Sequence, residues 1–255
     1  MYVNVHLNPN SIDELFFAGK TTVVIDVLRA TSTIVTALSN GAKEIIPVAS
    51  VEFAVKVSGG MFGGHTLIGG ERNTKKIEGF ALGNSPLEYK KDVVCGKTII
   101  LYTTNGTRSI VKAKFSENLF ICSFLNIHAV AKRLLKIKKD VEILCSGRNG
   151  TFSMEDTVCA GKLISEMQDQ SENIELTDSS KASVALSKTF GRSIEKLMKQ
   201  TEHGMLLLEN GFKEDIKYCS NLNIINVLPF FSQNVIKLFG EEKSSGGKAK
   251  KTKTK

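Results

Sequence analysis

Three segments of the chain place an arginine and several hydroxyl or amide side chains directly after an apolar run. They are residues 25–32, 102–108 and 144–150. Arginine suits forked recognition of phosphate, carboxylate or sulfonate groups, and free N–H groups at the start of a helix favour anions. If the apolar runs are strands of one parallel sheet, the segments meet at the same edge. They therefore predict a binding site for a small, highly anionic ligand.

Acidic side chains accompany these segments. The acids are Asp26, Glu71, Glu155 and Asp156. Acids repel an anionic ligand unless a cation lies between them, and hard oxygen ligands beside a phosphate suit Mg²⁺. The combination predicts metal-assisted phosphoryl chemistry on the bound ligand.

Each of these residues also has a structural interpretation. Asp26 lies at the end of a buried strand pattern, where an acid must be bound to a metal or paired, and one arginine could do the pairing. Asp156 follows Ser153 at the spacing of a capping box. Residues 31–33 can cap the next helix, and residues 105–106, Asn-Gly, form a common turn.

A long irregular region, residues 69–86, carries Glu71 and Arg72 between two predicted regular elements. Loops of this length in compact domains are usually functional or disordered, and the apolar residues in this one favour an ordered, functional loop. Its end predicts a short helix, with Ser85 as the N-cap, Pro86 as the first helical residue and Glu88 as the capping-box partner.

The elements that must position these residues alternate along the chain. Predicted strands cover residues 2–7, 23–25, 44–49, 66–69, 98–102, 119–122, 141–145 and 223–231, with Pro47 suggesting an edge or a bulge. Predicted helices include residues 127–137, 153–167 and, in pieces, 182–219. This alternation predicts a three-layer α/β/α fold with a largely parallel or mixed sheet. A division into lobes 1–165 and 181–242, with the site between them, is a variant of that fold.

The positive charge of the chain is concentrated at its end. The 255 residues carry a formal charge of +8, and six lysines lie within residues 243–255, so that +2 is left when they are removed. This Gly/Ser/Lys segment cannot bury enough apolar surface to fold, and we expect a disordered tail after a phosphatase domain of residues 1–242. A nucleic-acid partner is disfavoured because the folded part is nearly neutral.

The cysteines and the lengths of the apolar runs indicate where in the cell the protein is expected. Five cysteines, with no C-x-x-C pair, favour reduced thiols in a cytoplasmic protein. We expect no signal peptide and no membrane partner, because no apolar run approaches the roughly 20 residues of a membrane helix.

The sequence does not match the familiar phosphatase signatures. Arg148 follows Cys145 three residues later, whereas a thiol-phosphate loop needs six, so Cys145 is interpreted as a buried strand residue. Asp26 lacks the second acid of a D-x-D motif, and the chain has no G-x-x-x-x-G-K-[ST] loop.

Four longer motifs together match one known family. DVLRATSTIVTAL, GGERNTKKIEGFALGNSPLEY, TTNGTRSI and CSGRNGTFSMEDTVCAG resemble the 2-phosphosulfolactate phosphatase family. The resemblance implies Mg²⁺-dependent hydrolysis of the phosphate ester of 2-phospho-3-sulfolactate to 3-sulfolactate and phosphate, a step of coenzyme M biosynthesis in methane-forming organisms. A substrate with phosphate, sulfonate and carboxylate on three carbons fits the arginine-rich segments.

The resemblance also implies roles for individual residues. Asp26, Arg29 and Arg148 would be catalytic, and Asp26, Glu71 and Asp156 would bind the metal. Substrate contacts would come from Arg72, Ser85, Thr104, Asn105, Gly106, Arg148 and Asn149. The attacking nucleophile is either a metal-activated water or Asp26 itself.

Other functions stay open at this stage. The same fold could hydrolyse phosphoglycolate or phospholactate, or the chain could bind an anion without catalysis. The chain could also form a homodimer.

Overall fold

The computed structural model describes residues 1–59 and 65–240. Its strands are β1 (Tyr2–His6), β2 (Thr21–Ile25), β3 (Glu44–Val48), β4 (Thr66–Arg72), β5 (Lys75–Lys76), β6 (Thr98–Tyr102), β7 (Asn118–Cys122), β8 (Val141–Cys145), β9 (Glu175–Leu176), β10 (Pro229–Ser232) and β11 (Val235–Leu238). Its helices are α1 (Ala30–Ser39), α2 (Val51–Gly59), α3 (Lys91–Val94), α4 (Gly106–Lys112), α5 (Ile127–Ile137), α6 (Met154–Gln168), α7 (Asp178–Phe190), α8 (Ile194–Gln200), α9 (Glu202–Glu209) and α10 (Lys213–Cys219), with 3₁₀ turns at Glu14–Phe17, Pro86–Glu88 and Phe124–Asn126.

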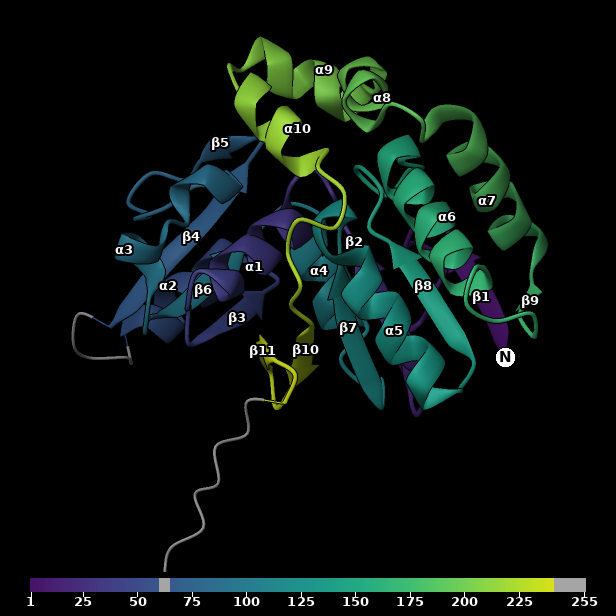
Figure 1. Cartoon of the computed structure of the whole chain (residues 1–255). Helices are drawn as coiled ribbons and strands as arrows, with labels where there is room; N and C mark the ends of the chain where they lie inside the picture. The colour runs from purple at the N-terminus through teal and green to yellow at the C-terminus, as the bar shows by residue number, and fades with distance from the viewer. Residues whose placement is uncertain (60–64, 241–255) are drawn as a thin grey trace, which may run out of the picture.

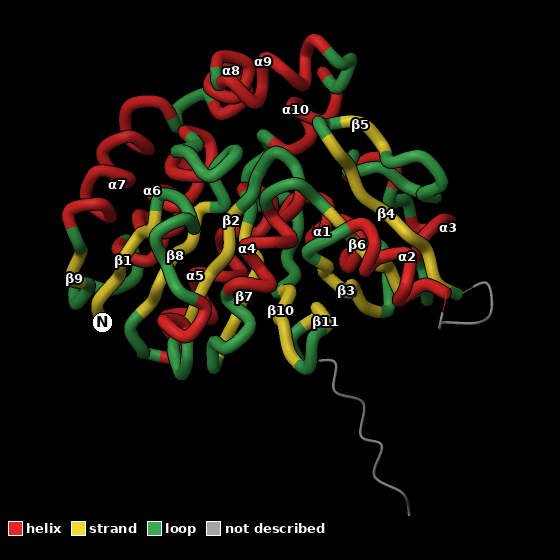
Figure 2. Tube along the Cα trace, turned by 180° about the vertical axis from the view of Figure 1, so that it is seen from behind, coloured by secondary structure: helices red, strands yellow, loops and turns green. Residues whose placement is uncertain are grey.

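The strands form one mixed sheet in the order β5-β4-β6-β3-β11-β10-β7-β2-β8-β1-β9 (Figure 1, Figure 2). β2 pairs in parallel with β7 and β8, and β6 pairs in parallel with β3 and β4. Three antiparallel pairings, β7 with β10, β10 with β11 and β11 with β3, lie between these two parallel groups. The segments that follow β2, β6 and β8 nevertheless meet, as predicted, because Gly106 lies against the Asp26 carboxylate and the N–H of Asn149 donates to Asn105.

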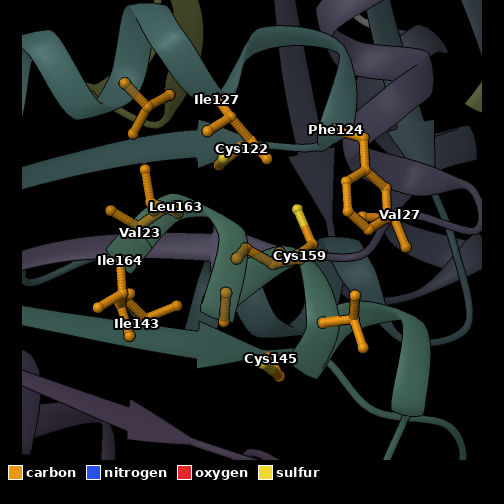
Figure 3. Packing of buried hydrophobic residues seen from close by; sticks show 14 of the residues in the cluster. Val23, Val27, Cys122, Phe124, Ile127, Ile143, Cys145, Cys159, Leu163 and Ile164 are labelled. Atoms are coloured by element: carbon orange, nitrogen blue, oxygen red, sulfur yellow. The ribbon is translucent and has the colours of Figure 1, made fainter. Parts of the chain in front are cut away.

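Side chains of the central strands alternate between two apolar layers. Val23 of β2 packs in one cluster with Leu163 of α6 (Figure 3), and Ile25 belongs to the same cluster. Val24 packs in another cluster with Ile34 of α1. Successive strand residues point to opposite faces, so a strand that is apolar throughout must be covered on both sides. The predicted three-layer α/β/α fold is confirmed.

The predicted strand at residues 223–231 is wrong in its extent. The chain forms an antiparallel hairpin instead, β10 and β11, whose turn residues Gln233 and Asn234 have φ of 51° and 64°. Positive φ at two successive turn residues is the geometry that suits a two-residue hairpin. β11 meets β3 at one residue pair, Ile236 with Ile45, so Pro47 lies in a part of β3 that pairs with β6 alone.

Both predicted lobes contribute to this sheet. β10 and β11 belong to residues 181–242, yet they lie in the middle of the sheet between β7 and β3. The helices α8, α9 and α10, which we call the cap, lie across the carboxyl ends of the central strands (Figure 1).

The predicted tail, residues 243–255, lies outside the described residues. In the described part of the chain, no helix has the length and apolar character needed to span a bilayer.

Candidate active site

A small pocket lies at the carboxyl ends of β2 and β6, beneath the cap. It is lined by Asp26, Leu28, Arg29, Glu71, Thr74, Asn84, Thr103, Asn105 and His203. Its volume of about 10 Å³ gives room for about one water molecule. A ligand larger than one water molecule needs more room than these side chains leave.

Asp26 directly follows β2 and joins the strand to α1. Its Oδ1 accepts the N–H of Ala30 at 3.2 Å, while the Thr31 hydroxyl hydrogen-bonds the backbone of Asp26. The prediction that residues 31–33 cap α1 is therefore wrong, because the Asp26 carboxylate accepts the first helical N–H. Oδ2 faces Gly106, where an added Cβ would lie 2.6 Å from that oxygen. Only glycine allows this close approach.

The environment of Asp26 disfavours its charged form. Burial raises its pKa to about 7, and the nearby carboxylates of Glu71 and Glu155 add to the rise, although the Ala30 N–H opposes it. Within the described residues Asp26 forms no ion pair, since Arg29 binds Asp215 instead. The structural alternative of an Asp26–Arg29 salt bridge is therefore wrong.

Glu71 connects the loop at residues 69–86 to the start of α4. Its Oε2 accepts the N–H of Thr74 at 2.9 Å, and its Oε1 accepts the N–H of Thr104 at 2.8 Å. Gly70 allows this approach of β4 to β6, because its φ is +148° and an added Cβ would lie 2.1 Å from the carbonyl oxygen of Tyr102. Glu71 thus fixes two predicted site segments against each other.

Asp156 fixes the other side of the Asp26 segment. Its two oxygens accept the N–H groups of Val27 at 2.9 Å and Gly147 at 3.2 Å. Ser153 caps α6 by accepting the Asp156 N–H at 3.4 Å, but the Asp156 side chain does not complete the predicted capping box. Burial raises the pKa of Asp156 well above its usual value, and Asp26 and Glu155 raise it further.

Arg29 lies in the wall of the pocket and is held on several sides. Its Nη1 donates to Asp215 at 2.6 Å, and its Nη2 donates to the carbonyl oxygen of Thr74 at 2.6 Å. The guanidinium also lies 4.0 Å from the ring centroid of Phe212. Ser85 donates to the second oxygen of Asp215 at 2.7 Å and makes no helix-capping bond, so the predicted Ser85 capping box is wrong.

The predicted substrate residues are not all in the pocket. Arg148 lies at the rim, where its Nη1 is 3.3 Å from Glu202 of the cap. The N–H of Asn149 donates to Oδ1 of Asn105 at 3.1 Å, which joins the segments after β8 and β6. Arg72 is exposed at the end of β4 and does not line the pocket.

Several buried polar atoms at this edge have no hydrogen-bond partner in the described residues. They are Thr74 Oγ1, Asn84 Oδ1, Thr104 Oγ1 and Ser146 Oγ. Buried polar atoms are normally paired, so unpaired ones gathered in one region indicate that a polar ligand or water completes them. This gathering supports the predicted anion site.

The acids fit a metal that shares its coordination with water and substrate. In residues 1–59 and 65–240, no three His, Cys, Asp or Glu side chains are grouped to hold a metal ion by themselves. Mg²⁺ usually binds one or two carboxylates together with water and phosphate oxygens, so it needs no such group. Oδ2 of Asp26 accepts no hydrogen bond from a described residue, whereas both oxygens of Glu71 and of Asp156 do. Asp26 has the oxygen most available to a metal, and Glu71 is the other predicted ligand in the pocket lining.

Two site residues, Asp215 and His203, could not be predicted from the sequence, because both come from the cap. His203 lies 3.9 Å from Glu155, and burial lowers its pKa to about 3, with Arg148 and Arg29 contributing. Thr74 and Asn84 were also missed, although they belong to the loop that was predicted to be functional. Cys145 is buried, and burial raises the pKa of its thiol well above the usual value, which agrees with a structural role.

Comparison with known proteins points to one family. The sequence profile described as 2-phosphosulpholactate phosphatase matches residues 6–234. Proteins named "Probable 2-phosphosulfolactate phosphatase" from Clostridium perfringens (strain SM101) and Caldanaerobacter subterraneus subsp. tengcongensis are 43% and 41% identical over 93% of this chain and 96% and 98% of theirs. A protein of the same name from Clostridium acetobutylicum is 39% identical over 92% of this chain and its own full length.

Proposed function

The chain belongs to the 2-phosphosulpholactate phosphatase family of phosphoric monoester hydrolases, and from this premise we propose its reaction. It hydrolyses the phosphate ester of 2-phospho-3-sulfolactate, with Mg²⁺, to 3-sulfolactate and phosphate. This is a reaction of the coenzyme M biosynthesis type. We also propose a cytoplasmic location, which the five free cysteines support.

One observation carries the proposal. Four buried polar atoms have no partner among the described residues: those of Thr74 and Asn84 line the pocket with Asp26, and those of Thr104 and Ser146 lie just after β6 and β8. A ligand with many oxygens, such as an ester bearing phosphate, sulfonate and carboxylate, would give these atoms hydrogen-bond partners. An apolar ligand would leave them unpaired.

Different residues at the pocket would bind the metal and the substrate. Asp26 and Glu71 would hold Mg²⁺, which when bound supplies positive charge between these acids and the phosphate. Arg29 presents an oriented guanidinium in the pocket wall, and Arg148 at the rim can reach an acid group of the substrate. Thr104 and Asn84 offer further hydrogen bonds to the oxygens of the substrate.

The reaction breaks the bond between phosphorus and the ester oxygen and forms a bond between phosphorus and the attacking oxygen. A proton must reach the ester oxygen as sulfolactate leaves. The attacking oxygen belongs either to a water molecule or to Asp26. A single turnover in ¹⁸O-labelled water gives a one-sided test. Label in the Asp26 carboxylate excludes direct attack by water, whereas label in the phosphate alone fits both routes, because water can also attack the phosphorus of an aspartyl phosphate.

Phosphate release from three substrates tests the proposal. We expect the purified protein with Mg²⁺ to hydrolyse 2-phospho-3-sulfolactate at least about tenfold faster, in kcat/KM, than phospholactate or phosphoglycolate, because the sulfonate supplies contacts that the others lack. Chelation with EDTA should abolish turnover. Asp26→Asn keeps the shape of the side chain and should lower kcat by about 10³ or more while the variant still unfolds cooperatively.

Two results would contradict the proposal. Equal kcat/KM on all three substrates would favour the alternative phosphatase of a simpler phosphorylated acid. Phosphate binding without turnover of any of the three would favour a non-catalytic anion-binding protein.

A further inference from the structure

We infer that Asp215, on cap helix α10, is a positioning residue that sets Arg29 and Ser85 in the active site. The inference rests on the proposed function for the identity of the substrate. Asp215 belongs to none of the segments that resemble the family motifs. The cap would thus be a working part of the site as well as a cover.

A single carboxylate connects the two site residues. Oδ2 of Asp215 accepts from Nη1 of Arg29 at 2.6 Å, and Oδ1 accepts from the Ser85 hydroxyl at 2.7 Å. The side chains of Arg29 and Asp215 are 1% and 4% exposed, so water does not screen the pair. Arg29 follows β2 and Ser85 ends the loop after β4, so Asp215 fixes their relative position.

α10 restrains Arg29 in a second way. The guanidinium stacks on Phe212, three residues before Asp215, at 4.0 Å from the ring centroid. Its Nη2 donates to the carbonyl oxygen of Thr74 in the loop below. The guanidinium therefore keeps one orientation only while α10 is docked, and that orientation places it in the lining of the pocket.

The pairing also changes what Arg29 can contribute. A buried arginine beside a buried aspartate is close to neutral as a pair, so Arg29 acts as an oriented hydrogen-bond donor more than as a net positive charge. Removing the aspartate charge leaves a buried guanidinium without a counter-ion, and the side chain can then turn toward Glu71 or toward solvent. Substrate positioning would be lost even where the fold is kept.

A double-mutant cycle tests this inference with Arg29→Met, Asp215→Asn and the double variant. We expect Asp215→Asn to lower kcat/KM on 2-phospho-3-sulfolactate by roughly 30-fold in the wild-type background and by less than about threefold when Arg29 is already methionine. Glu214→Gln, an exposed neighbour on the same helix, is the matched control and should leave kcat/KM unchanged. Equal losses in both backgrounds, or full activity of Asp215→Asn, would overturn the inference.

Binding of inorganic phosphate, measured by titration calorimetry, gives a readout that does not depend on turnover. If the wild type binds phosphate but hydrolyses no phosphosulfolactate, the proposed function fails while the same cycle, built from dissociation constants, still tests Asp215. If Asp215→Asn does not fold, Ser85→Ala removes one bond to the carboxylate without burying a lone charge. That variant should weaken phosphate binding several-fold, and wild-type affinity would count against the positioning role.

Discussion

At the scale of single residues, two carboxylates show how partners decide the state of a buried acid. Burial alone would raise the pKa of Glu142, but hydrogen bonds from His6, Lys20 and Asn4 outweigh it and hold the pKa at about 2. Asp26 has only the Ala30 N–H and the charge of Arg29 to oppose burial and the neighbouring carboxylates, and its pKa rises to about 7. Glu142 therefore stabilises the fold when ionised, whereas an ionised Asp26 costs stability. Such a cost is typical of a residue kept for function.

The state of Glu142 predicts a signed dependence of stability on pH. The folded pKa of about 2 lies below the ordinary value of 4.5, so its stabilising contribution is present above pH 4.5 and is lost as the pH falls through 2. Glu142→Gln should lower the free energy of unfolding by about 2 kcal/mol at pH 7 and by about 1 kcal/mol at pH 3, where the folded group is still largely ionised. Urea unfolding at both pH values measures this difference.

The exposed Glu175 on β9 supplies the control for that measurement. Glu175→Gln should leave the free energy of unfolding nearly unchanged at both pH values. If Glu142→Gln costs the same at pH 3 as at pH 7, the ionised form of Glu142 is not what stabilises the fold.

At the scale of elements, the close contact between α1 and α4 depends on Gly106. An added Cβ there would lie 2.4 Å from the Cβ of Ala30 and 2.6 Å from Oδ2 of Asp26. Alanine is the better helix former by about 1 kcal/mol, so propensity alone favours the substitution. The contacts oppose it, because two helix starts would have to separate and the Asp26 carboxylate would have to move.

We therefore expect Gly106→Ala to lower the melting temperature and to reduce kcat/KM by at least about tenfold. At Gly59, at the end of α2, an added Cβ would meet no described residue within 4 Å, so Gly59→Ala is the control and should change neither quantity. The double variant Ala30→Gly/Gly106→Ala should recover part of the stability but little activity, because the Asp26 contact persists. Full recovery of activity would show that the Asp26 contact is unimportant.

The elements also show what the sequence could and could not predict. The bounds predicted for β6, β8 and α5 agree with the structure. Each of these elements carries an apolar pattern that matches the faces it buries, so the pattern can be recognised without knowing its packing partners. The partner of Arg29 could not be predicted, because Asp215 lies 186 residues away and its exposed neighbour Glu214 looks no different in sequence. The hairpin of β10 and β11 was missed because its Gln-Asn turn lacks the glycine that normally marks such turns.

At the scale of the whole molecule, the hairpin joins two halves of the sheet that share the site. β10 pairs with β7 on one side, and β11 pairs with β3 on the other through Ile236 and Ile45 alone. Asp26 and Asp156 belong to the half that contains β2 and β8, whereas Glu71 and Thr104 belong to the half that contains β4 and β6. The relative position of the two sets of site residues thus depends on this contact as well as on the direct packing of α4 against α1 and β2.

This arrangement predicts that a destabilising substitution in the hairpin lowers activity more than an equally destabilising substitution within one half of the sheet. Ile236 is fully buried, so Ile236→Ala should lower the free energy of unfolding by about 3 kcal/mol. Leu134→Ala in α5, also fully buried, should cost a similar amount but removes contacts in one half only. We expect kcat/KM below the unfolding transition to fall several-fold in Ile236→Ala and to stay near the wild-type value in Leu134→Ala. Equal activities in the two variants would mean that the hairpin stabilises the sheet without setting the geometry of the site.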